Sequence, residues 1–101
     1  MSSILTNNKY GTITTSSGTA SVTFDANNGI VYKIWIKPAT ESTVYDFKFT
    51  DYHSEDVFLE EDIKGTYSET DVGEPIYGNF TLTIENASAD EEFTYLIVYR
   101  S

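Results

Sequence analysis

Apolar and polar residues alternate along most of this chain, and the apolar ones are mainly β-branched or aromatic. Of the 101 residues, 29 are Val, Ile or Thr, and 14 more are Tyr or Phe. Such side chains suit the pleated, half-buried surface of a sheet and lose rotamer freedom in a helix. Because no segment shows a helical period of apolar residues, the sequence predicts an all-β protein.

Turn-forming residues recur every 8 to 12 positions or so, which is the spacing typical of a sandwich or barrel. One such cluster is Asp71–Pro75, and another is Asp51–Asp56. Strands are predicted at about 9–15, 19–25, 29–37, 43–51, 56–61, 63–68, 76–86 and 92–100. We therefore expect a single antiparallel β-sandwich, jelly-roll-like, with about eight strands.

The alternation also predicts which side chains face the core. In the third strand the row expected to face the core is Ile30, Tyr32, Ile34 and Ile36. The row expected to face outward is Val31, Lys33, Trp35 and Lys37. In the last strand Phe93, Tyr95, Ile97 and Tyr99 form the apolar row. Leu96 and Val98 lie on the other side of that strand, so we expect it to be central and covered, or partly buried by a partner.

A chain of 101 residues is long enough for one small domain. We assign residues 9–101 to the sandwich and residues 1–8 to an N-terminal arm that docks on a partner, with Ile4 and Leu5 as its apolar contacts. The first residues carry neither a charged segment nor a long apolar run. We therefore expect no secretion signal and no membrane anchor.

The negative charge is concentrated in the middle of the chain. The formal net charge is −10, and the segment Glu41–Glu74 holds eleven acidic residues against two lysines. Nucleic acids and anionic membranes are bound by clustered Lys and Arg, but the recurrent basic positions here are Lys33 and Lys37 alone. The sequence disfavours both partners, and we expect the acidic segment to face solvent.

The residue types needed for catalysis are scarce. The chain has no cysteine and a single histidine, His53, which lies in a polar turn without a nucleophile motif. The glycines are isolated and form no phosphate-binding loop. We therefore expect neither an enzyme nor a cofactor. The acidic runs Glu55–Asp56 and Glu60–Asp62 allow two interpretations, a Ca²⁺ site or a solvated acidic surface.

Trp35 is the most informative single residue, and two interpretations of it stay open. It could be covered by a second sheet or a loop, with the stems of Lys33 and Lys37 lying along it. Alternatively, it is an exposed aromatic anchor for a partner or a sugar ring. If Leu96 and Val98 share its face, the three form an apolar patch that favours an interface.

Three passages carry a resemblance to a known class of proteins. They are the Thr/Ser/Gly-rich segment 11–24, the segment 29–38 with GIVYKIWIKP, and the segment 75–87 with GNFTLTIENA, followed by the closing apolar strand 94–99. Together they resemble small β-sandwich virion proteins of tailed bacteriophages. The resemblance covers most of the chain but contains no invariant motif, so it assigns no binding residue.

This resemblance implies a structural role in a virion. The expected function is that of a capsid decoration or cement protein, with a head–tail or tail accessory protein as the alternative in the same class. A carbohydrate-binding or surface-binding module of the same fold is the alternative outside that class. The implied partner is the major capsid protein or another virion subunit, bound by many copies in a symmetric assembly. The protein would then be made in the bacterial cytoplasm and located in the virion.

Overall fold

Residues 6–24, 29–51, 53, 55–76 and 78–100 are described by a computed structural model, in which every regular element is a strand. The strands are β1 (Thr6–Thr14), β2 (Ala20–Phe24), β3 (Gly29–Pro38), β4 (Val44–Thr50), β5 (Asp56–Lys64), β6 (Tyr67–Ile76), β7 (Phe80–Glu85) and β8 (Glu92–Arg100). The described residues include no helix long and apolar enough to cross a membrane. The all-β prediction is confirmed.

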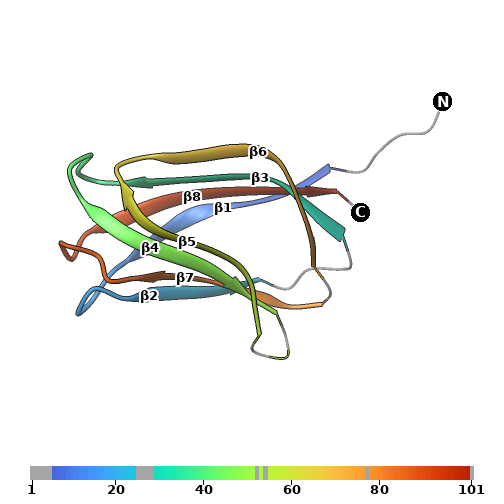
Figure 1. Cartoon of the computed structure of the whole chain (residues 1–101), viewed down its shortest axis with the longest axis horizontal. Coiled ribbons are helices and arrows are strands. Elements are labelled where there is room, and N and C mark those ends of the chain that lie inside the picture. The colour runs from blue at the N-terminus through green and yellow to red at the C-terminus, as the bar shows by residue number, and fades with distance from the viewer. Residues whose placement is uncertain (1–5, 25–28, 52, 54, 77, 101) are drawn as a thin grey trace.

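The chain is arranged like a long hairpin that has been rolled up, because its strands pair from the ends inwards. β1 pairs with β8, β2 with β7, β3 with β6 and β4 with β5, all antiparallel. The pairs β3–β8 and β4–β7 join them into two sheets, β1-β8-β3-β6 and β2-β7-β4-β5 (Figure 1). Eight antiparallel strands in two such sheets form a jelly roll, so the predicted sandwich is confirmed.

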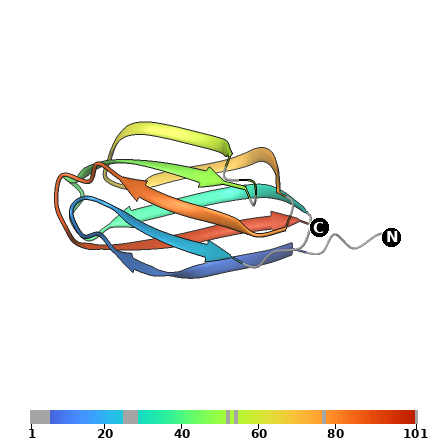
Figure 2. The same cartoon turned by 90° about the horizontal axis from the view of Figure 1, so that it is seen from below.

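The two sheets face each other with their edges aligned. Figure 2 shows β1 and β2 along one side of the sandwich, and β5 and β6 along the other. The edge strands of the two sheets contact each other on both sides. The molecule therefore has two outer faces and two long edges.

The core lies between the sheets and is supplied mainly by their central strands. Each of β3, β4, β7 and β8 places alternate side chains inward, as an antiparallel sheet with one wet face requires. The buried hydrophobic residues are Phe24, Val31, Ile34, Ile36, Tyr45, Phe47, Phe49, Phe80, Leu82, Ile84, Phe93, Tyr95, Ile97 and Tyr99. Aromatic rings meet across the sandwich, for example Tyr45 and Phe93 with centroids 5.0 Å apart. The predicted apolar row of the last strand is confirmed.

Tyr45 is a core residue with a polar group. Its hydroxyl donates a hydrogen bond to the carbonyl oxygen of Gly65 at 2.8 Å, and burial raises the pKa of the phenol. Among the described residues, every buried side-chain nitrogen or oxygen has a hydrogen-bond partner. The polar side-chain groups buried among these residues are therefore satisfied, as in most native cores.

The first half of β3 differs from the prediction. Val31, which we expected to face outward, is fully buried, whereas Ile30, which we expected in the core, is 51% exposed. The reason is a β-bulge, because Tyr32 has no opposite residue on β8. One extra residue inverts the side-chain alternation, so the prediction is correct for Ile34 and Ile36 after the bulge and wrong before it.

The predicted turn at Asp71–Pro75 is also wrong, since these residues lie within β6. The turn lies earlier, at Gly65, so the predicted strand 63–68 is divided between β5 and β6. Residues 71–73 form a bulge of three residues opposite Tyr32, with positive φ at Asp71 (58°) and Gly73 (77°). Turn-forming residues here widen a strand instead of ending it.

Candidate binding face

The outer face of sheet β1-β8-β3-β6 carries three apolar side chains next to one another. Leu96 on β8 lies opposite Tyr10 on β1 and, on its other side, opposite Trp35 on β3. Tyr10 is 68% exposed, and Leu96 and Trp35 are half-buried. We call these three residues the apolar row. They cross three adjacent strands and therefore form one continuous strip.

Basic residues flank the apolar row along the strands. Lys33 lies opposite Val98, and Lys37 lies opposite Thr94 on the other side of the row. Arg100 follows Val98 on the outward side of β8, and Glu92 is the acidic residue at the opposite end of that strand. We call this surface, with the apolar row and its flanking Lys33, Lys37 and Arg100, the basic face. It carries three of the six basic residues of a protein whose net charge is −10.

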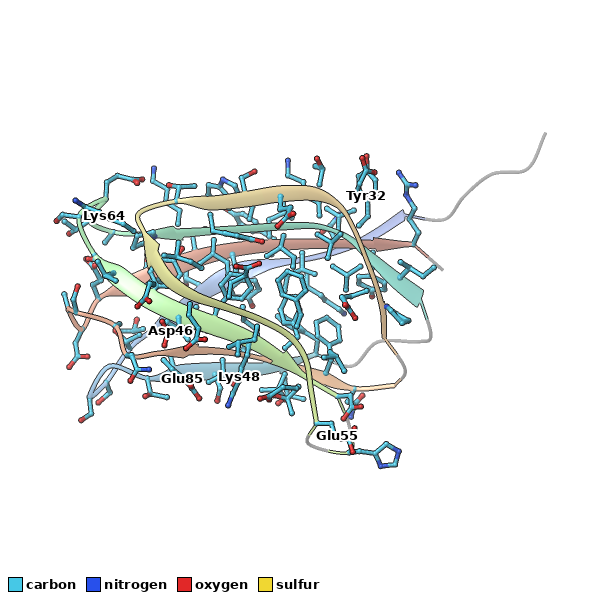
Figure 3. The ribbon with its side chains drawn as sticks, in the orientation of Figure 1. Tyr32, Asp46, Lys48, Glu55, Lys64 and Glu85 are labelled. Atoms are coloured by element: carbon cyan, nitrogen blue, oxygen red, sulfur yellow. The ribbon has the colours of Figure 1, made fainter. Side chains whose placement is uncertain are left out.

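A shallow pocket lies on the same outer face at the bulge. The guanidinium carbon of Arg100 lies 3.8 Å from the centre of the Tyr32 ring, and Figure 3 shows Tyr32 projecting from the upper side of the molecule. The pocket has a volume of about 260 Å³. Its lining residues are Ile30, Val31, Tyr32, Asp71, Gly73 and Arg100.

The two bulges create this pocket. They displace Tyr32 on β3 and the residues around Asp71 on β6, and bulges characteristically redirect side chains next to binding sites. A Cβ atom added to Gly73 would meet no heavy atom within 4 Å, so the space beside it is open. The hydrogen-bond donors of Arg100 and the acceptors of Asp71 border an apolar surface. This combination can hold a small polar ligand or a partner's side chain.

The acidic residues gather along the edge formed by β5 and β6. This acidic edge comprises Asp56, Glu60, Glu61 and Asp62 on β5 and Glu69, Asp71 and Glu74 on β6. Most of these side chains are exposed. No group of three or more acidic or histidine side chains among the described residues is placed to hold a metal ion. Ca²⁺ at Glu55–Asp56 or Glu60–Asp62 stays a prediction.

Glu41 fastens the turn between β5 and β6. Its carboxylate accepts hydrogen bonds from the Thr66 hydroxyl at 2.6 Å and from the Thr66 backbone N–H at 2.9 Å. These two bonds lower the pKa of Glu41, with a smaller contribution from Lys37. One acid of the negative segment is therefore a structural group that holds the turn.

The residues singled out from the sequence fall mainly on one surface. The basic face contains Trp35, Lys33, Lys37, Leu96 and Val98. Ile4 and Leu5 lie outside the described residues, and residues 6–8, which we assigned to the arm, pair with β8. His53 is exposed in the loop between β4 and β5, where its backbone N–H donates to Asp51.

Sequence reasoning missed Tyr10, Tyr32 and Arg100 on this surface. The alternation of β1 does place Tyr10 on the strand's polar side, which was an available signal. Its contact with Leu96 could not be inferred, because it depends on the pairing of the first and last strands. Tyr32 and Arg100 meet only because of the bulge.

No protein-family model matches the sequence, and no curated protein matches it either. Among the described residues, the basic face and the pocket beside it bring apolar and polar side chains together at the surface.

Proposed function

We propose that this protein is a non-enzymatic structural protein of a bacteriophage virion, and specifically a capsid decoration protein that binds and stabilises the assembled shell. The observation that carries the proposal is the apolar row of Tyr10, Leu96 and Trp35 flanked by Lys33 and Lys37. Aromatic residues and apolar side chains surrounded by a polar rim are typical of protein interfaces.

The charge distribution supports docking in one orientation. The basic face lies on the outside of one sheet, and the acidic edge runs along β5 and β6 at the side of the sandwich. A partner surface that carries acidic groups attracts the first and repels the second, so complementary charge favours one approach. The acidic edge would then remain in solvent on the assembled particle.

The fold is compatible with this role without deciding it. Jelly rolls occur in viral capsid proteins and also in lectins, so the architecture hosts both candidate functions. The proposed partner is the major capsid protein or another virion subunit, and the tail or the head–tail junction is the alternative location. Many copies on a symmetric shell would turn a modest contact into strong attachment.

The experiment is co-sedimentation of the chain with purified shells of the phage that encodes it. Leu96→Ser removes the middle of the apolar row, and we expect it to weaken shell binding by about tenfold or more, as loss of a central interface residue does. Leu59→Ser is the matched control, because Leu59 is 49% exposed on the other sheet. Binding of this control should equal that of the wild type.

Three results would contradict the proposal. The chain could fail to bind shells, Leu96→Ser could bind as the wild type does, or both serine variants could lose binding to the same degree. A circular-dichroism melt of both variants separates lost binding from lost folding. Because both leucines are partly exposed, each variant should fold.

A carbohydrate-binding module is the second candidate, and the pocket at the bulge favours it. An Arg donor, an Asp acceptor and an aromatic ring around about 260 Å³ suit a sugar ring, which presents hydroxyls at its rim and C–H groups on its faces. A glycan array probed with the wild type and with Tyr32→Ala tests it. Reproducible binding that Tyr32→Ala abolishes would support this function, and an array without a signal would refute it.

A further inference from the structure

The four edge strands of the sandwich differ in how well they are protected against pairing with another chain. β5 and β6 carry acidic residues and bulges, and β6 also contains Pro75. β2 is only five residues long. β1 is nine residues long, pairs with β8 without a register shift and carries a single charge, Lys9. Charges, bulges, proline and shortness are the usual protections of an edge, and β1 has the fewest of them.

We propose that β1 pairs antiparallel with β1 of a second copy of this chain. A symmetric dimer uses the same surface of both copies, and an exposed strand edge offers unpaired N–H and C=O groups to such a partner. Within the described residues β8 is the one strand paired with β1. The pairing uses the backbone edge of β1, so it does not rest on the proposed function, although Tyr10 of β1 also belongs to the apolar row.

The backbone of β1 shows which residues would form the new hydrogen bonds. Thr15, just after β1, donates its backbone N–H to the carbonyl oxygen of Glu91, in continuation of the β1–β8 ladder. Because backbone groups alternate along a strand, the odd-numbered residues of β1 point towards β8. The even-numbered residues, among them Asn8, Tyr10 and Thr12, therefore present their backbone groups to the free edge.

One antiparallel register pairs every residue of β1 with a residue of the second copy. Tyr10 is the central residue of β1. If the twofold axis passes between the two copies of Tyr10, then Tyr10 lies opposite its own copy and Asn8 lies opposite Thr12. All nine residues of the strand then pair. Lys9 lies opposite Gly11, which has no side chain, so no like charges face each other across the interface. Two exposed tyrosine rings would pack side by side, which is a favourable cross-strand pair.

The net charge does not oppose this contact strongly. The acidic edge lies on the far side of the sandwich, and three strand spacings of about 4.8 Å place β6 roughly 14 Å from β1. Charges separated by more than about 8 Å of solvent are largely screened in physiological salt. The dimer would also join the two apolar rows into one strip across an eight-stranded sheet, from Trp35 of one copy to Trp35 of the other.

Sedimentation-velocity centrifugation over a range of concentrations tests the pairing, with N8K/T12K as the disrupting variant. In the proposed register this variant places like charges opposite each other twice, and we expect the dimer Kd to rise by about tenfold or more. N8E/T12K places opposite charges at the same positions and should dimerise at least as well as the wild type. S68K/T70K adds the same charge as N8K/T12K to exposed positions of β6, and its dimer should persist.

Amide hydrogen exchange gives a second readout on the wild type. Raising the protein concentration should slow exchange at Tyr10 and Thr12, whose N–H groups point to the free edge, and leave Ile13 unchanged. A wild type that stays monomeric at millimolar concentration would overturn the proposal. A dimer that N8K/T12K leaves intact would overturn it too, as would a dimer that S68K/T70K disrupts equally.

Discussion

The two outer faces of the sandwich differ in how their exposed side chains are paired. On the face of β2-β7-β4-β5, polar groups satisfy one another: Lys48 lies 3.0 Å from Glu85 and 3.9 Å from Asp56. Figure 3 shows Lys48 and Glu85 next to each other on the lower side of the molecule. On the basic face, the described residues form no ion pair, and Arg100 instead lies over the ring of Tyr32.

This difference indicates which surface side chains the stability of the sandwich does not require. Both faces belong to four-stranded sheets above the same core, so stability alone would permit the same polar cover on each. The face of β2-β7-β4-β5 has polar pairs beside its exposed apolar residues Val44 and Leu59, and the Thr23 and Thr81 hydroxyls are also hydrogen-bonded at 2.9 Å. Within the described residues, the basic face combines a continuous apolar row with basic side chains that form no ion pair, which is why we propose the partner there.

The largest expected loss of stability distinguishes a core residue beneath the bulge, Val31, from its exposed neighbour Ile30. Val31→Ala should lower the free energy of unfolding by about 2 kcal/mol, because it leaves a cavity beneath the bulge. Ile30→Ala, one residue away on the exposed side, should change it by less than about 0.5 kcal/mol. Urea unfolding measures the free energy of unfolding of both variants. Equal losses would contradict the claim that the bulge buries Val31 and exposes Ile30.

A smaller effect compares the lysines of the two faces. Lys48→Met should lower the Tm at low salt, because hydrogen bonding to Glu85 and attraction by Glu85 and Asp56 raise the pKa of Lys48 and favour its charged form. That stabilisation is present below the ordinary pKa of a lysine and is lost as the pH rises through the raised one. Lys37→Met should lower the Tm less, because Lys37 forms no ion pair within the described residues and makes only a smaller contribution to the charged form of Glu41. Differential scanning calorimetry at low and high salt tests both, and a Tm loss with Lys37→Met alone would reverse the comparison.

The smallest effect concerns the turn that joins the two sheets at the acidic edge. Glu41→Gln removes one of the acceptors of Thr66 and should destabilise the protein at neutral pH. Since the hydrogen bonds lower the pKa of Glu41, the stabilisation is present above the ordinary Glu value of about 4.3 and is lost as the pH falls through the lowered value. The difference from the wild type should therefore shrink in acid. Glu61→Gln controls for the loss of one charge, and an equal profile for both would contradict the role of Glu41.

Much of the fold could be predicted from the chain because its central strands follow a strict two-residue alternation. Phe93 to Tyr99 on β8 is the clearest case, since every second side chain is buried. The errors at Ile30 and at Asp71–Pro75 share one cause, which is the pair of bulges where β3 meets β6. The bulge on β3 adds a residue without a distinctive residue type, and the bulge on β6 uses Asp71 and Gly73, residue types that a turn uses as well, so local patterns do not separate a bulge from a strand end.

The candidate site was predictable only in part for a related reason. Trp35 and Leu96 each stand out within their own strand, but their contact depends on β3 pairing with β8. Tyr10 joins them through the pairing of the first strand with the last, a relation between residues 86 positions apart that no local pattern encodes. Local patterns thus identify the faces of single strands, and the rolled-up topology decides which of them meet.

The central claim is that the basic face is buried against a virion shell, and the single tryptophan of the chain reports on it directly. Acrylamide quenching of Trp35 fluorescence should be moderate in the free protein, where the side chain is half-buried. When non-fluorescent shells carrying Phe in place of Trp are added, we predict that quenching falls and the emission shifts to the blue. Binding to the shells with unchanged Trp35 quenching and emission would contradict the account.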